Sequence, residues 1–159
     1  MIRAAYSDKK LVAAMLAKSF NNNKSVNYIV KQDAKRVHRL RNLMEYSFEI
    51  CYLFGDVFFT ADKKGCALVI LPDKKKTTIK SILLDLKLVF SCVGLFNLTR
   101  VMRREGEIKK LQPKEPLYYL WFIGVDQQNN IRVLEAPCFR MLSKKACLCK
   151  EPFVWKRLH

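Results

Sequence analysis

Residues 117–125, Leu-Tyr-Tyr-Leu-Trp-Phe-Ile-Gly-Val, form the strongest strand signal in this 159-residue chain. The run is aromatic and almost wholly apolar; two prolines, Pro113 and Pro116, precede it and Asp126 follows it at once. An unbroken apolar run of this length predicts a strand that is central in a sheet and covered on both faces. We therefore expect the preceding chain to supply strands and helices that pack around it.

Two further strands are predicted as a β-hairpin in the middle of the chain. Val57–Thr60 and Cys66–Leu71 are apolar and rich in residues that favour strands, and Asp62–Gly65 between them has the composition of a turn. A short apolar run at Ile2–Tyr6 predicts a first strand near the N-terminus.

Apolar residues recur at helical spacing in two long segments before the hairpin. The first helix is predicted from a cap at Ser7 or Asp8 to about Phe20, and the second from a cap at Asp33. A shorter helical stretch, Ser25–Lys31, lies between them. The positions expected to face the core are Leu11, Val12, Met15, Leu16 and Phe20 in the first helix, and Val37, Leu40, Leu43, Met44, Phe48 and Cys51 in the second.

A long helical region is predicted after the hairpin, beginning at Thr77 or Thr78 and divided by Gly94. Its densest apolar part invites interpretation as a membrane span. Asp85 and Lys87 interrupt that part, whereas a span needs about 20 apolar residues without central charges. We therefore expect no span, and instead a pair of amphipathic helices that is buried or covers a substrate.

Composition favours one globular domain, because half of the residues are apolar. The net charge of +16 favours acidic partners such as nucleic acid, anionic lipid or a phosphorylated cofactor, although a merely basic surface has the same composition. No apolar run of signal-peptide length occurs at the start, so we expect a cytoplasmic protein with reduced thiols.

The predicted order is strand, helices, hairpin, helices and a strong strand that ends in an aspartate. This order, and the sequence Tyr118–Asp126 in particular, resembles the first four strands of the GNAT superfamily of N-acetyltransferases. The resemblance covers residues 1–126 and implies an α+β fold of the three-layer α/β kind, with helices flanking a mixed central sheet. It also implies acetyl-CoA as cosubstrate and acetyl transfer to the amine of a small molecule or a peptide.

One motif of that family is missing. Its fourth strand leads into a glycine-rich turn, where backbone N–H groups and a helix N-terminus hold the coenzyme pyrophosphate. Here Gln127–Asn130 is followed by Ile131–Leu134, and no glycine occurs after Gly124. We therefore expect the sheet to be incomplete at its C-terminal end, with residues 1–130 as part of an acetyltransferase domain and 131–159 as an atypical basic, cysteine-containing tail.

A shift of reading frame explains the missing turn. Read one base early, codons for Ile131–Cys138 can encode Lys-Gly-Ile-Gly-Ser-Thr-Leu-Leu, which is a glycine-rich turn opening a helix. Codons for Met141–Lys144 likewise permit Val-Ile-Glu-Lys, and those for Lys150–Leu158 permit Arg-Thr-Ile-Cys-Leu-Glu-Thr-Ser-Thr. If one base is missing between the codons for Asp126 and Asn130, restoring it gives the aspartate-to-glycine spacing of the family. We hypothesise either a frameshifted gene or an error in its nucleotide sequence.

The resemblance implies that backbone groups near Ile123, Gly124 and Val125 face the acetyl and pantetheine arm of acetyl-CoA, although a plain core strand would have the same apolar pattern. The catalytic residues stay unknown, because the candidate bases Glu45, Glu49 and Asp126 cannot be ranked from sequence.

The other candidate sites have weaker support in the sequence. The cysteines and histidine of the tail do not have the usual zinc spacing, so we expect no metal; they are Cys138, Cys147, Cys149 and His159. His38 lies in a basic segment and is expected at the surface. A basic nucleic-acid-binding protein without enzymatic activity is the alternative function, favoured by the net charge and by the basic clusters at 35–41 and 144–145.

Overall fold

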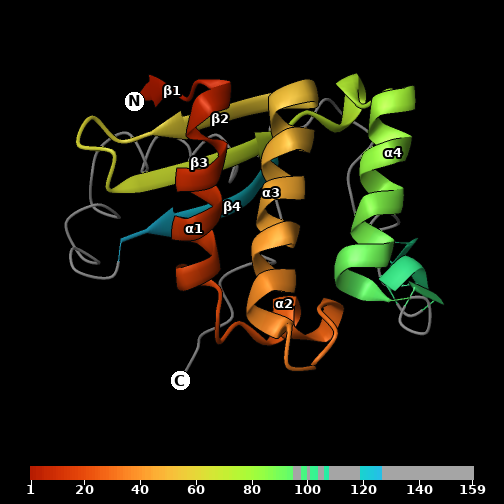
Figure 1. Ribbon diagram of the computed structural model, residues 1–159. Helices are drawn as coiled ribbons and strands as arrows, with labels where there is room; N and C mark the ends of the chain where they lie inside the picture. The colour runs from red at the N-terminus through yellow and green to blue at the C-terminus, as the bar shows by residue number, and fades with distance from the viewer. Residues whose placement is uncertain (95–97, 100, 104–105, 108–118, 127–159) are drawn as a thin grey trace.

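The computed structural model describes residues 1–94, 98–99, 101–103, 106–107 and 119–126. Its four strands form one sheet in the order β1-β2-β3-β4, and every neighbouring pair is antiparallel. Helices α1 and α3 lie across one face of this sheet, and α4 lies beside α3 on the side away from α1 (Figure 1). The strands are β1 (Ile2–Arg3), β2 (Gly55–Phe59), β3 (Gly65–Ile70) and β4 (Tyr119–Val125). The helices are η1 (Tyr6–Asp8), α1 (Lys9–Ser19), α2 (Lys24–Ile29), α3 (Arg36–Phe54), η2 (Pro72–Lys74), α4 (Ile79–Leu88) and the π-helical turn η3 (Val89–Val93).

The two long helices form where apolar spacing predicted them, with corrections at their edges. Leu11 and Val37 were expected to face the core but are 46% and 70% exposed, whereas Ala13 is fully buried in α1. A helix buries only a stripe against a sheet, and these two apolar residues lie outside it. The cap of α3 is Lys35 and not Asp33, which lies two residues earlier. The Asp33 carboxylate accepts the Lys35 N–H at 3.0 Å and the Arg39 guanidinium at 2.8 Å.

The expected hairpin is confirmed, but the strand covered on both faces is β3 and not β4. All six residues of β3 are buried, whereas β4 is half-buried along most of its length. Within the described residues β4 pairs with β3 alone and so forms an edge of the sheet. The strand expected at the centre is therefore the last of the four that the structure describes.

No loop separates α3 from β2. The helix ends at Phe54, and Gly55 is already paired with Ile70 of β3. A Cβ atom at Gly55 would lie 2.1 Å from the backbone oxygen of Val69, so only glycine fits this close approach of the two strands.

The helix after the hairpin begins where predicted. Thr78 caps α4, its hydroxyl accepting the Ser81 N–H at 3.2 Å while the Ser81 hydroxyl accepts the Thr78 N–H at 3.0 Å. The π-helical turn that follows ends at Gly94, whose φ of +73° favours glycine. Within the described part of the chain, no helix is long and apolar enough to cross a membrane. Of the two expected alternatives, a buried helix pair or one that covers a substrate, full burial does not hold for α4, because large apolar side chains on its outer side are exposed. Covering of a substrate stays a prediction.

Candidate functional site

Strand β4 contains a β-bulge at Trp121. Phe122 pairs with Leu68 and Leu120 pairs with Val69, so Trp121 is an extra residue without a partner on β3. A bulge bends its strand and turns side chains away from the regular alternation, and bulges occur often beside active sites.

The bulge places two successive aromatic side chains on one face of the sheet. Trp121 and Phe122 both pack against the core beneath the helices, while Leu120 and Ile123 belong to a second cluster that includes Ala67 and Val69 of β3. Regular alternation would have sent one of the two aromatic rings to the opposite face. The bulge thus concentrates ring surface at the edge of the sheet that α1 and α3 cover.

Four rings meet there. Phe20, at the end of α1, contacts Phe122 edge-on, with ring centroids 5.2 Å apart, and Tyr46 of α3 contacts Trp121 in the same way at 6.5 Å. Trp121 and Phe122 lie 5.3 Å apart. All four side chains are only partly buried. These four rings, which we call the aromatic wall, therefore form an apolar, partly accessible surface beside the backbone of β4.

The three residues implied as cofactor contacts lie at the end of β4. Ile123 and Val125 belong to the cluster on the face opposite α1, and Gly124 faces α1. A Cβ at Gly124 would come within 2.7 Å of Leu16 Cδ2, so the missing side chain lets α1 approach the strand. The Ser19 hydroxyl donates to the Val125 carbonyl at 3.0 Å. Gly124 thus has a packing role of its own, and cofactor contact by these residues stays a prediction.

Among the candidate bases, Glu49 is committed to a buried ion-pair cluster. One carboxylate oxygen, Oε1, accepts from the Tyr6 hydroxyl at 2.5 Å and from Lys9 Nζ at 3.0 Å, and Lys80 Nζ lies 3.8 Å from the other oxygen, Oε2. Burial raises the pKa of Glu49, but the hydrogen bonds from Tyr6 and Lys9 and the charges of the two lysines outweigh burial and lower it. A base for an ammonium needs a pKa near the working pH, so this cluster disfavours Glu49 in that role.

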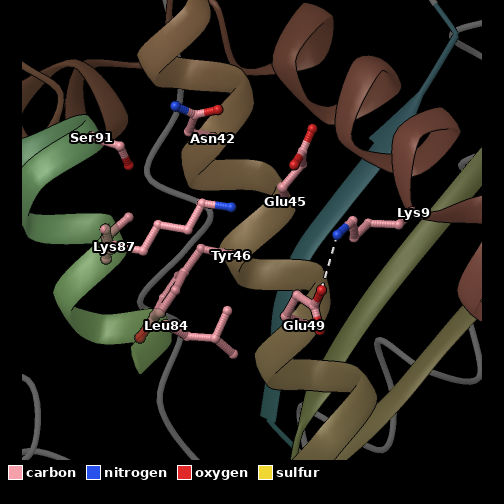
Figure 2. Close-up of a pocket in the computed structure, with 9 residues that line it drawn as sticks. Lys9, Asn42, Glu45, Tyr46, Glu49, Leu84, Lys87 and Ser91 are labelled. Atoms are coloured by element: carbon pink, nitrogen blue, oxygen red, sulfur yellow. Dashed lines mark hydrogen bonds and ion pairs between the residues drawn. The ribbon is translucent and has the colours of Figure 1, made fainter. Parts of the chain in front are cut away.

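Glu45 lies one helical turn before Glu49 and lines a pocket between α3 and α4 (Figure 2). Tyr46 joins this pocket to β4, because its ring contacts Trp121 while its hydroxyl donates to Asp85 of α4 at 2.6 Å. Lys87 enters the pocket from α4 and Lys9 from α1. Of the three candidates, Glu45 is the half-exposed carboxylate nearest in sequence to the aromatic wall.

The third candidate, Asp126, lies elsewhere. It follows β4, and its N–H donates to the Lys64 carbonyl in the hairpin turn at 2.8 Å, so the structure does not bring it together with the carboxylates of α3. His38 is exposed, as expected. Among the described residues no group of three metal-ligating side chains occurs. The cysteines and histidine of the tail lie outside the described residues.

Sequence reasoning missed the bulge and the link through Tyr46. An apolar strand has no polar alternation to interrupt, so a bulge leaves no mark in its pattern. A signal did exist on α3, where Asn42, Glu45, Tyr46 and Glu49 recur at helical spacing and form one wall of the pocket.

Comparison with solved structures supports the fold. The chain is similar to a structure described as histone acetyltransferase HPA2 and related acetyltransferase, from Corynebacterium glutamicum ATCC 13032, with a TM-score of 0.58 and 14% identity, covering 91% of this chain and 70% of that one. At this identity the likeness establishes the fold alone, and the expected GNAT-like α+β class is confirmed at that level. No protein-family model matches the sequence, and neither does any curated protein.

Proposed function

We propose that the chain derives from a GNAT-type N-acetyltransferase, which moves an acetyl group from acetyl-CoA to the amine of a small molecule or a peptide. The observation that carries this proposal is the fold, which an acetyltransferase shares over 91% of the chain. The bulged edge of β4 supports it, since the described residues leave the other side of that edge without a strand.

Backbone groups of an open strand edge suit the amide-rich pantetheine arm of acetyl-CoA. In a strand, N–H and C=O groups alternate along each edge, so they match the spaced amides of an extended ligand. The proposed contacts are Ile123, Gly124 and Val125, the last residues of β4. The amine nitrogen would attack the thioester carbonyl and the C–S bond would break, so that CoA leaves as its thiolate. A base would take the amine proton, and Glu45 is our candidate for that base.

We also propose that acetyl-CoA binding is impaired in this chain. The pyrophosphate carries two negative charges that need convergent N–H donors, and the sequence after Asp126 has no glycine to bring a backbone close. We infer that the turn was lost through a shift of reading frame before Ile131, because the codons from there permit a glycine-rich turn in the shifted frame. The aromatic wall and the strand edge would then contact the acetyl and pantetheine arm of acetyl-CoA, while its pyrophosphate would have no binding site.

The test compares two proteins: the chain as it is, and the product of the same gene with one base inserted between the codons for Asp126 and Asn130. Calorimetry should detect no acetyl-CoA binding at micromolar concentration by the first and clear binding by the second. Release of the CoA thiol in the presence of a panel of amines should follow the same order. A repaired, folded chain that neither binds acetyl-CoA nor releases thiol would refute the proposed activity, and micromolar affinity of the unrepaired chain would refute the impairment.

The alternative of a nucleic-acid-binding protein rests on the net charge of +16. Binding to single strands uses aromatic rings exposed among basic residues, whereas the rings of the aromatic wall pack against the core. Gel-shift measurements with RNA and DNA between 50 and 200 mM salt, roughly the range over which phosphate contacts are lost, separate the two functions. Absence of binding at the lowest salt would remove the alternative.

A further inference from the structure

The outward side of α4 is a stripe of exposed, large apolar residues. Its two ends are the most exposed, with Ile79 at 81% and Phe90, in η3, at 68%. The residues of the stripe follow one another at intervals of three or four positions, which keeps their side chains on one side of a helix. Its members are Ile79, Ile82, Leu83, Leu86 and Phe90, which we call the α4 stripe.

The other side of the same helix already faces the core. Ser81 is buried there, and Leu84 and Leu88 pack against the main apolar cluster. A helix that is apolar on both sides is normally covered on both sides. Within the described residues the stripe is nevertheless open to solvent, and Figure 1 shows α4 at the outer flank of the helical layer.

Positive charge lies at the N-terminal end of the stripe. Lys74, Lys75 and Lys76 are exposed between Asp73 and α4. Lys80 and Lys87 extend instead from the flank of α4 toward α3, where Lys80 lies 3.8 Å from Glu49 and Lys87 lines the pocket (Figure 2). The acidic residue of the helix, Asp85, accepts a hydrogen bond from Tyr46. The surface at the N-terminal end of the stripe is therefore basic.

The charge of the whole chain disfavours a second copy as the cover, because each copy carries a net charge of +16 and two copies repel. An apolar stripe preceded by three exposed lysines instead matches an anionic lipid surface. The apolar side chains would enter the acyl boundary and the lysines would reach the headgroups.

We propose that the α4 stripe, together with Lys74–Lys76, docks the protein onto anionic bilayers, with α4 lying in the plane of the surface. This goes beyond the proposed acetyl transfer and does not depend on it. A single amphipathic segment of this kind binds reversibly, and its binding weakens as salt screens the lysines.

The first experiment is co-sedimentation of the full chain with vesicles of phosphatidylcholine alone or mixed with phosphatidylglycerol. We expect binding to the anionic vesicles, little binding to the neutral ones, and loss at high salt. Replacing Lys74, Lys75 and Lys76 by glutamine should weaken the affinity by about fivefold for each lysine. The matched control removes three exposed lysines elsewhere, at Lys10, Lys18 and Lys24. Equal losses in the two triple variants would show that net charge alone binds the lipid and would overturn the proposal.

A second pair of variants tests the apolar contact. Leu83→Glu with Leu86→Glu should reduce vesicle binding more than tenfold, since charges do not enter the acyl boundary. Leu11→Glu with Val37→Glu adds the same charge at exposed apolar positions on α1 and α3 and should retain most of the binding. Circular dichroism checks the fold of each variant, and the lysine variants decide the question if the first pair unfolds. No binding to anionic vesicles, or a dimer in sedimentation that the α4 pair abolishes, would overturn lipid docking.

Discussion

Replacing Glu49 by glutamine isolates the charge of the buried carboxylate whose partners come from η1, α1 and α4. Glutamine keeps an oxygen that can accept from Tyr6 and Lys9, but it removes the negative charge that those partners and Lys80 surround. A hydrogen bond to a charged group is worth roughly 1 kcal/mol more than a neutral one, and two such bonds are weakened. The exposed pair with Lys80 adds little. We expect Glu49→Gln to lower the free energy of unfolding by about 2 kcal/mol at pH 7.

The pH dependence of that loss identifies its cause. The pKa of Glu49 is lowered in the folded protein, so the stability it contributes is fully present above the ordinary glutamate pKa of about 4.3 and is lost as the pH falls through the folded value. The difference between wild type and variant should therefore vanish at low pH. The pKa of Lys9 is raised, so its contribution is lost only at strongly alkaline pH.

Urea unfolding followed by circular dichroism between pH 3 and 8, roughly the range that brackets glutamate titration, measures the effect. Glu45→Gln, one turn earlier on the same helix and half-exposed, is the matched control and should change stability little. A loss that is the same at every pH would refute the electrostatic reasoning, because it would point to packing. No loss at pH 7 would show that the cost of burying the carboxylate already cancels its bonds.

Three further predictions follow from packing, capping and burial. Gly124→Ala should destabilise the protein by about 1–3 kcal/mol, because the new methyl group meets Leu16. The control Gly106→Ala adds its methyl group in open space and should be neutral or stabilising in the same urea assay. The reverse order would contradict the packing role of Gly124. Thr78→Ala should cost about 1 kcal/mol through loss of the cap, with Thr77→Ala as the control, and equal effects would contradict the capping box. Native-state alkylation at pH 8 should spare the three buried thiols, because burial raises their pKa, in one case to about 12, and rapid labelling of any of them would show that the core opens. These thiols are Cys51, Cys66 and Cys92.

The sequence predicted the positions of helices and strands better than it predicted which of them pack together. The hairpin, the cap at Thr78 and the break at Gly94 depend on local residue chemistry, and the structure confirms all three. Leu11 and Val37 were assigned to the wrong side because helical spacing tolerates an apolar residue at the edge of the stripe. We expected β4 to be the most buried strand, whereas β3 is. The order of the strands in the sheet decides this, and the residue pattern of a single strand does not reveal that order.

The candidate site was less predictable than the fold. The contact of Tyr46 with Trp121 joins residues far apart in the sequence. The bulge at Trp121 cannot be recognised from the sequence, because every neighbouring residue is apolar. The partners of Glu49 come from η1, α1 and α4, so its lowered pKa could not follow from its own helix. The sequence alone does show that no glycine occurs after Gly124.

The direct junction at Gly55 couples the site to the sheet. With no intervening residue to absorb a displacement, a tilt of α3 must be accompanied by a movement of β2, and through its pairing by a movement of β3. Tyr46 and Glu49 are thereby held in a fixed relation to the very strand on which β4 is aligned. Enlarging this one glycine would force the two strands apart and shift the aromatic wall relative to its carboxylate neighbours, so a distant substitution at position 55 would disturb both halves of the site together.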